Sequence, residues 1–266
     1  MLHLLPALTA YILTLTAVLG LVMGSFAACT AGRLAAGEDF LRSRSRCDAC
    51  GHTLSPRDLV PVFSWLFLRG RCRYCGARIP ARCPLTELLC AAAFLGIVLR
   101  YDVTLIAFRD LAAAVLLLIA ALVDYDTGIL PDGLTGALAV NFLLFAGLQG
   151  GDIWARIWQG FLGGAAAAVP LLALVLLMDR VLGRESMGGG DLKLLFASGL
   201  YLTWRDALFL LIVCCVLGIL FALLSGRTTG DPENPRAFPF GPAIAAGVYI
   251  ALLAAEPVRV WYLSLF

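Results

Sequence analysis

The chain contains Glu185-Ser-Met-Gly-Gly-Gly-Asp-Leu-Lys-Leu-Leu195, in which an aspartate, Asp191, comes directly before an apolar run. An aspartate in the centre of a membrane helix costs about 2.5 to 3.5 kcal/mol on insertion scales, so a retained one usually faces a protein interior and has a function. The glycines Gly188, Gly189 and Gly190 lack a Cβ, which lets a peptide or a helix approach their backbone closely. The stretch therefore predicts a helix that begins at a functional carboxylate, with the three glycines shaping the entry for a substrate backbone or serving only as a hinge.

A second aspartate has a similar setting. Asp124 ends an apolar run and is followed by a turn that reaches Pro131 and Asp132. Two nearby carboxylates cannot both ionise at low cost, so one keeps a proton, and the pair can act as general base and general acid on a water molecule. This is the chemistry of aspartic proteases. In the alternative interpretation each aspartate only caps a helix or reaches the membrane interface, as Asp132 after Pro131 is expected to do.

The composition places the chain among integral membrane proteins. Of its 266 residues, 61% are hydrophobic and only 14% are charged, against about 25% charged in soluble domains. We expect an all-α polytopic fold of about eight transmembrane helices, with a small cytoplasmic zinc-binding domain between the first two. The expected spans are 7–28, 85–99, 105–123, 134–148, 159–178, 192–202, 207–224 and 240–255. The span after Asp191 is short enough to be a partial or re-entrant helix.

The distribution of basic residues predicts the orientation in the membrane. The first apolar run is longer than the core of a signal peptide and its positive charges follow it, so we expect a retained helix with its N-terminus outside. Ten arginines lie between Arg33 and Arg82, which favours a cytoplasmic loop over a nucleic-acid-binding patch. Alternating the spans then puts Asp124 and Asp191 at the same, cytoplasmic edge of the bilayer. Lys193, the only lysine, either influences this pair, meets the substrate or marks the inner membrane surface.

Four cysteines in the polar segment 29–83 have the spacing of a metal site. Cys47 and Cys50 form one CxxC knuckle, and Cys72 and Cys75 form a second one after 21 intervening residues. Four thiolates from two tight turns can close a tetrahedron around a structural zinc ion, and cytosolic thiols stay reduced for this purpose. The alternatives are redox dithiols or cysteines without a ligand. With four cysteines available, the neighbouring His52 is not expected to bind the metal.

Seven motifs in order resemble the type IV prepilin peptidases over nearly the whole chain. They are GSF (24–26), the two CxxC knuckles, PVFSWLFLRGRCRYC (61–75), PLTELL (84–89), VDYDTGILPD (123–132), GGGDLKLL (188–195) and PFGP (239–242). The resemblance implies a bacterial inner-membrane aspartic endopeptidase with Asp124 and Asp191 as its catalytic pair at the cytoplasmic face. It implies prepilin or pseudopilin substrates of a type IV pilus or type II secretion system, whose short basic leader is cut after a glycine and before a hydrophobic helix. Besides these substrates only membrane lipid is expected as a partner, and no nucleic acid.

The resemblance also implies a second activity, N-methylation of the new N-terminus with S-adenosylmethionine, which the family associates with the cysteine-containing loop. Two family motifs, GSFLNV and DNIPV, commonly contain an asparagine that is absent from the corresponding stretches 24–30 and 58–62 of this chain. These two departures bear on methylation and not on cleavage. The expected organisation is a first transmembrane helix (1–28), a four-cysteine domain (29–83) and a transmembrane peptidase domain (84–266).

Two alternative functions belong to other classes of membrane protein. One is a secondary transporter that uses Asp124 and Asp191 as a proton relay, and the other is a zinc-dependent membrane hydrolase. No inverted repeat supports the first, and no HExxH motif supports the second.

Overall fold

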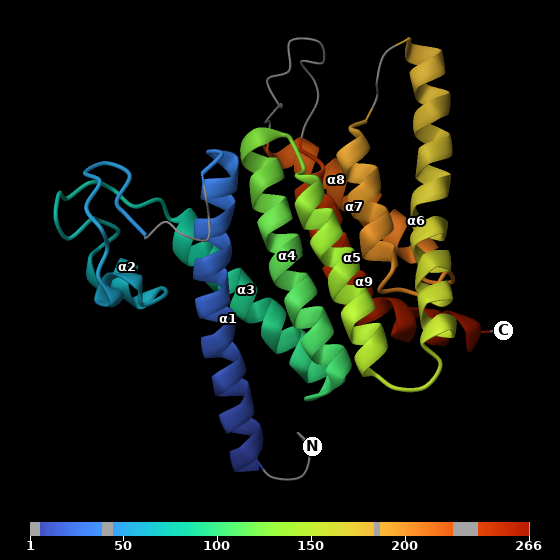
Figure 1. Cartoon of the computed structure of the whole chain (residues 1–266), viewed down its shortest axis with the longest axis horizontal. Helices are drawn as coiled ribbons and strands as arrows, with labels where there is room; N and C mark the ends of the chain where they lie inside the picture. The colour runs from blue at the N-terminus through green and yellow to red at the C-terminus, as the bar shows by residue number, and fades with distance from the viewer. Residues whose placement is uncertain (1–5, 39–44, 184–186, 226–238, 266) are drawn as a thin grey trace. The chain divides into compact units, whose positions relative to one another are not determined.

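The computed structural model describes residues 6–38, 45–183, 187–225 and 239–265, in which the regular elements are helices apart from two isolated β-bridges (Figure 1). The all-helical prediction is thus confirmed. The chain divides into two compact units, residues 1–107 and 108–266, which are described separately. The elements are α1 (Pro6–Ala35), the 3₁₀ helix η1 (Pro56–Leu59), α2 (Phe63–Phe67), α3 (Arg82–Tyr101), α4 (Leu105–Thr127), α5 (Asp132–Leu148), α6 (Ile153–Leu182), α7 (Gly189–Gly199), α8 (Ala207–Ser225) and α9 (Gly241–Leu263).

Six of the described helices are long and apolar enough to cross a membrane, not the expected eight. They are α1, α3, α4, α6, α8 and α9. The other two expected crossings correspond to α5, with 17 residues, and α7, with 11. At 1.5 Å per residue these helices measure about 25 Å and about 16 Å, whereas the bilayer core is about 30 Å thick. The first helix, in contrast, continues past the expected end at Ala28 to Ala35, with Arg33 in its last turn, where a cation stabilises the helix dipole.

In the first unit, α1 and α3 pack at very close range. Gly20 and Gly24 form a small-xxx-small pattern, which lets helix backbones approach each other in a membrane. A Cβ on Gly20 would lie 2.6 Å from the Cα of Ala91, and a Cβ on Gly24 would lie 2.6 Å from the Cα of Glu87. No larger residue fits at these two positions without moving one helix. The GSF motif is therefore explained at Gly24 by helix packing.

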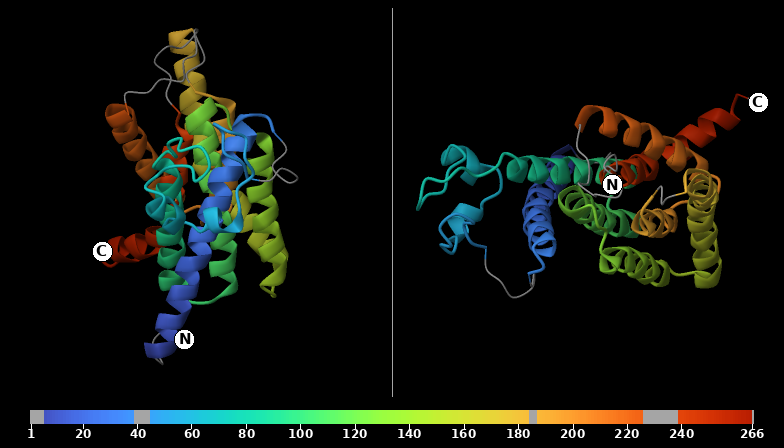
Figure 2. Two further views of the ribbon diagram at one scale, coloured as in Figure 1. Left: turned by 90° about the vertical axis from the view of Figure 1, so that its left-hand side faces the viewer. Right: turned by 90° about the horizontal axis from the view of Figure 1, so that it is seen from above.

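In the second unit, the short helix α7 lies inside a ring made by α4, α5, α6, α8 and α9, as the view from above shows (Figure 2). Glycines on two helices allow this placement. A Cβ on Gly164 of α6 would lie 2.8 Å from the carbonyl oxygen of Phe196, and one on Gly199 of α7 would lie 2.7 Å from the Cα of Gly164. Leu194, Leu195 and Ser198 of α7 are fully buried. The centre of this unit is therefore the helix that carries Asp191.

Candidate active site and metal centre

Asp124 lies near the end of α4, and its side chain is hydrogen-bonded to the backbone of Gly241, the first residue of α9. Its side chain is buried, with 4% of the residue exposed, and its Oδ2 accepts a 2.7 Å hydrogen bond from the backbone N–H of Gly241. The first N–H groups of a helix have no partner within the helix and carry its positive dipole end, so they stabilise a carboxylate. A Cβ on Gly241 would lie 2.7 Å from the same Oδ2 and 2.8 Å from the Cβ of Asp124. Position 241 therefore needs a glycine.

Gly241 was missed as a functional residue in the sequence. It belongs to the motif PFGP, which contributed to the family resemblance but received no role. The available signal was a glycine followed by Pro242 at the start of an apolar run, because proline is favoured in the first turn of a helix. The sequence did not indicate which side chain this helix start would meet.

Asp191 lies in the first turn of α7, beside Asp124. The two carboxylates are close enough to repel each other electrostatically. Gly190 brings the start of α7 against the turn that follows α4, since a Cβ on it would lie 3.1 Å from the Cβ of Leu130. Oδ1 of Asp191 is buried and has no hydrogen-bond partner among the described residues. A buried carboxylate oxygen without a donor is suited to hold a water molecule or a polar group of a substrate.

The remaining glycines and the lysine of this stretch have less contact with the pair. A Cβ on Gly188 would lie 4.0 Å from Oδ2 of Asp191, and one on Gly189 would have no atom of the described residues within 4 Å. Lys193 points to α5, where its Nζ lies 2.7 Å from Oδ1 of Asp132. Asp132 begins α5, as expected, but its side chain pairs with Lys193 across to α7. Because both side chains are more than half exposed, the ion pair itself adds little stability.

The four cysteines of the first unit lie together in two equivalent turns. Cys47 donates its N–H to His52 O and accepts from the N–H of Gly51, while Cys72 donates to Ala77 O and accepts from the N–H of Gly76. Gly51 and Gly76 have φ values of +69° and +73°, in the left-handed region that glycine adopts readily. Each sequence CxxCG thus folds into the same knuckle.

The donor set of these knuckles fits a tetrahedral metal ion. The four Sγ atoms of Cys47, Cys50, Cys72 and Cys75 lie within 4.8 Å of one another, and those of Cys47 and Cys75 are 3.8 Å apart. With Zn–S bonds of about 2.3 Å, a tetrahedral zinc ion would hold its sulfurs about 3.8 Å apart. Backbone N–H groups of Cys50 and Ala49 lower the pKa of Cys47 to about 7, which favours the thiolate that binds metal. The cluster can hold a metal, and His52 is not in it but packs on Tyr74 with ring centroids 3.7 Å apart.

Asp58 connects the 3₁₀ helix η1 to the second knuckle of the cysteine domain. It accepts hydrogen bonds from the Ser55 hydroxyl, the Arg73 guanidinium and the Tyr74 hydroxyl, so η1 is tied to the residues between Cys72 and Cys75. The Ser55 and Arg73 contacts hold the pKa of this carboxyl well below its usual range. In the sequence this aspartate was noted only as part of the motif 58–62. Its role is to position the second knuckle.

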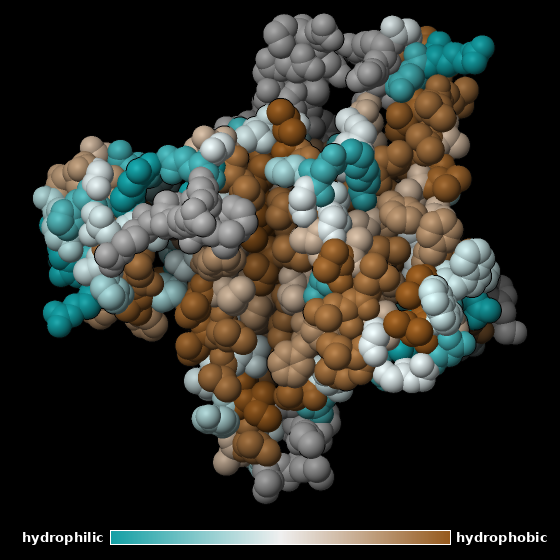
Figure 3. Space-filling model, in the orientation of Figure 1, coloured by the Kyte–Doolittle hydropathy of each residue, from teal (hydrophilic) through white to brown (hydrophobic). Residues whose placement is uncertain are grey.

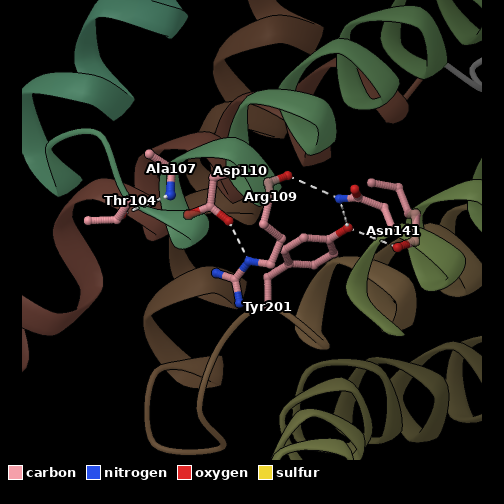
Figure 4. Close-up of polar contacts among 7 residues, drawn as sticks. Thr104, Ala107, Arg109, Asp110, Asn141 and Tyr201 are labelled. Carbon is pink, nitrogen blue, oxygen red and sulfur yellow. Dashed lines mark hydrogen bonds and ion pairs between the residues drawn. The ribbon is translucent and has the colours of Figure 1, made fainter. Parts of the chain in front are cut away.

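A second polar cluster lies in the other half of α4, and the sequence did not reveal it (Figure 4). Arg109 Nε lies 2.7 Å from Oδ1 of Asp110, whose side chain is fully buried, and the guanidinium stacks on the ring of Tyr201 at 5.0 Å. Asn141 donates to the carbonyl of Arg109 and to the hydroxyl of Tyr201, which donates to Leu138 O. Asp110 is about 21 Å along the helix from Asp124, so this cluster connects helices and does not contact the pair. The available signal was a polar residue inside each of two apolar runs, Asp110 in α4 and Asn141 in α5.

Comparisons with known proteins agree with the motifs. Residues 18–101 match the family model described as Bacterial Peptidase A24 N-terminal domain, and residues 111–223 match that of the Type IV leader peptidase family. The chain is 36% identical to the prepilin leader peptidase/N-methyltransferase of Aeromonas salmonicida, over 83% of this chain and 75% of the relative. It is also 36% identical to the protein of that name from Myxococcus xanthus (85% and 68% covered), and 29% identical to that from Bacillus subtilis (95% and 98%). No solved structure matches.

Proposed function

Because this chain belongs to the type IV leader peptidase family, we propose that Asp124 and Asp191 are the catalytic carboxylates of an endopeptidase that removes the short basic leader of prepilins or pseudopilins after a glycine. The family resemblance expected from the motifs is confirmed, and with it the function of a prepilin leader peptidase/N-methyltransferase. The observation that supports the two residue roles is that Asp124 and Asp191 are within electrostatic reach of each other, that Asp124 has a backbone donor, and that Asp191 has a buried oxygen without a partner among the described residues.

The proposed reaction needs only the two side chains and one water molecule. A water between the carboxylates gives a proton to the ionised one as its oxygen attacks the scissile carbonyl carbon, while the protonated carboxyl gives its proton to the carbonyl oxygen. The tetrahedral intermediate then collapses. The C–N bond breaks, the protonated carboxyl gives its proton to the leaving amine, and the other carboxylate takes a proton from one hydroxyl of the intermediate, which becomes the new carboxyl group. The N–H of Gly241 occupies one oxygen of Asp124 throughout, which directs its other oxygen to the water. The free oxygen of Asp191 supplies the second contact.

The chain is a multi-pass membrane protein of a bacterial family, with six candidate membrane spans in its described part. We propose that it resides in the inner membrane with its N-terminus outside and with the carboxylate pair at the cytoplasmic face. The arginine-rich segment between α1 and α3 supports this orientation. In this arrangement α5 and α7 are shorter membrane-embedded helices beside the six candidate spans, and the substrate reaches the pair from the side of the bilayer where its basic leader lies.

For the cysteine domain we propose a structural zinc ion held by Cys47, Cys50, Cys72 and Cys75, and participation of residues 29–83 in methylation. The complete set of thiolates supports a structural metal, since a catalytic zinc site normally keeps an open position. S-adenosylmethionine would supply the methyl group for the new N-terminal residue. The relatives' name, which includes N-methyltransferase, supports this activity.

The decisive experiment follows the mass of a purified prepilin. The wild-type enzyme is incubated with prepilin and labelled S-adenosylmethionine, beside Asp124→Asn and Asp191→Asn, and the N-terminus of the product is measured by mass spectrometry. We expect the wild type to remove the leader and add one methyl group, and each variant to leave the prepilin intact. Cleavage by either variant at the wild-type rate contradicts the proposed roles. The transporter is favoured if the wild-type protein does not cleave prepilin but transports protons in liposomes, and if the aspartate variants lose this transport.

A further inference from the structure

Beside the first turns of α7, the second unit has an apolar groove that the proposed reaction does not use. The groove has a volume of about 520 Å³ and is formed by three helices, α5, α6 and α7. Its lining residues are Asp132, Thr135, Gly136, Ala139, Ala168, Val169, Leu172, Leu192, Lys193, Phe196 and Ala197. The surface over α5 and α6 is mainly hydrophobic, as expected where it would contact lipid (Figure 3). The groove therefore offers apolar surface within the membrane-embedded part of the chain.

The groove has the small side chains that helix packing in membranes requires. Gly136 and Ala139 line it on α5, Ala168 on α6 and Ala197 on α7. Without a hydrophobic driving force inside the bilayer, helices associate through close backbone approach at such small residues. A Cβ on Gly136 would have no atom of the described residues within 4 Å, so the space beside this backbone is open. A second helix could approach α5 closely here.

The position of the groove relates it to the scissile bond. Leu192 and Lys193, which line it, directly follow Asp191 in α7. Along α5 the groove extends from Asp132 to Ala139, which corresponds to about 10 Å or two helical turns. Its apolar part starts beyond the Asp132–Lys193 ion pair, so polar and apolar surfaces follow each other in the order expected for a chain that leaves the active site and enters the bilayer.

The polar end of the groove is formed by an ion pair. Oδ1 of Asp132 lies 2.7 Å from Nζ of Lys193, and both side chains are more than half exposed. A segment bound along the groove would therefore meet a polar surface first and an apolar surface beyond it. A lipid acyl chain would match only the apolar part.

We propose that the groove between α5, α6 and α7 binds the first two turns of the substrate's hydrophobic helix, just beyond the scissile bond. This inference rests on the proposed function and adds the surface that recognises the mature part of the substrate. Binding there positions the bond to be cut at Asp124 and Asp191, so the helix contributes to affinity. Cleavage of a short peptide that ends before the helix does not depend on the groove.

The test fills the groove and compares two substrates. Gly136→Leu places a side chain in the open space, and Cys215→Leu makes a small-to-large change at an exposed position of α8 outside the groove. We expect Gly136→Leu to raise KM for full-length prepilin about tenfold or more, with kcat/KM for the short peptide unchanged. Cys215→Leu is expected to match the wild type with both substrates. An unchanged KM of Gly136→Leu for prepilin, or an equal loss with both substrates, overturns the proposal.

A binding measurement separates this proposal from the proposed catalysis. In the Asp191→Asn background, Ala139 is replaced by a photoreactive amino acid and the protein is irradiated with prepilin in liposomes. We expect a cross-link to the hydrophobic helix from position 139 and none from position 215. Cross-links from position 139 to lipid alone identify the groove as a lipid site and overturn the inference. Failure of the catalytic proposal has a different signature, because Asp191→Asn would then still remove the leader.

Discussion

The backbone N–H of Gly241 lies 2.7 Å from Oδ2 of Asp124, so the start of α9 fixes a carboxylate near the end of α4. The two residues are 117 positions apart in the chain. The contact explains why a glycine opens α9, since the space that a Cβ would need is filled by the aspartate. It also connects α9 to the proposed chemistry through a backbone group.

Replacing this glycine is expected to impair catalysis more than folding. Gly241→Ala forces either α9 or the Asp124 carboxylate to shift, and a displacement of about 1 Å in an active site can cost about 100-fold in rate. We expect kcat for prepilin cleavage to fall by about that factor, measured with purified enzyme in detergent. Gly133→Ala is the control, because a Cβ on Gly133 would have no atom of the described residues within 4 Å. Full activity of Gly241→Ala would show that Asp124 does not depend on this contact.

Metal removal is expected to affect the two activities differently. Chelation at neutral pH, or Cys47→Ser, should remove the bound zinc and unfold the knuckles, because the cysteine domain has few buried apolar residues to hold it otherwise. We expect metal analysis to find about one zinc per wild-type chain and a strongly reduced amount in Cys47→Ser. Methylation should fall with it, while leader cleavage is retained to a larger extent. Cys215→Ser, outside the cluster, should keep its metal, and an equal zinc content in Cys47→Ser would contradict the assignment.

The parts of the site that were predictable are those with local sequence signals. The CxxC knuckles determine their own turns through Gly51 and Gly76, so the four-cysteine cluster followed from spacing alone. Asp124 and Asp191 stood out because a charge at the end of an apolar run is costly. The contact of Gly241 with Asp124 and the ion pair of Lys193 with Asp132 depend on tertiary packing, which leaves no local pattern.

The fold was predictable at the level of helices and less so for their lengths. Hydropathy identified every helix of the second unit, but α7 ends at Gly199 and is too short to cross the bilayer. Near its C-terminal end, Gly163 and Gly164 of α6 and Gly199 of α7 bring the two helices into direct backbone contact. A hydropathy average treats these glycines as neutral and so cannot predict this packing.

The pH dependence of the cysteine domain is expected to follow Asp58. Its pKa is lowered in the folded protein, so its contribution to stability is present above the unfolded value of about 3.9 and is lost as the pH falls through the folded one. Asp58→Asn should make the domain more sensitive to limited proteolysis at pH 7, and the difference from the wild type should shrink below about pH 4. Asp48→Asn is a matched control, since the carboxylate of Asp48 accepts no hydrogen bond from the described residues. A difference between Asp58→Asn and the wild type that does not vary with pH would rule out this linkage.

The cluster around Asp110 predicts a non-additive effect on stability. Arg109→Met alone leaves a fully buried carboxylate without its partner, which costs about 3 to 5 kcal/mol, and Asp110→Leu leaves a half-buried guanidinium on the ring of Tyr201 without its carboxylate. Replacing both removes two charges from the apolar interior, so Arg109→Met/Asp110→Leu should be more stable than either single variant. Thermal unfolding in detergent measures all four proteins. Because the cluster is about 21 Å along α4 from Asp124, the double variant should retain most of its peptidase activity below its melting temperature. Additive losses in the double variant would mean that the two side chains act independently and that the ion pair is not the source of the stability.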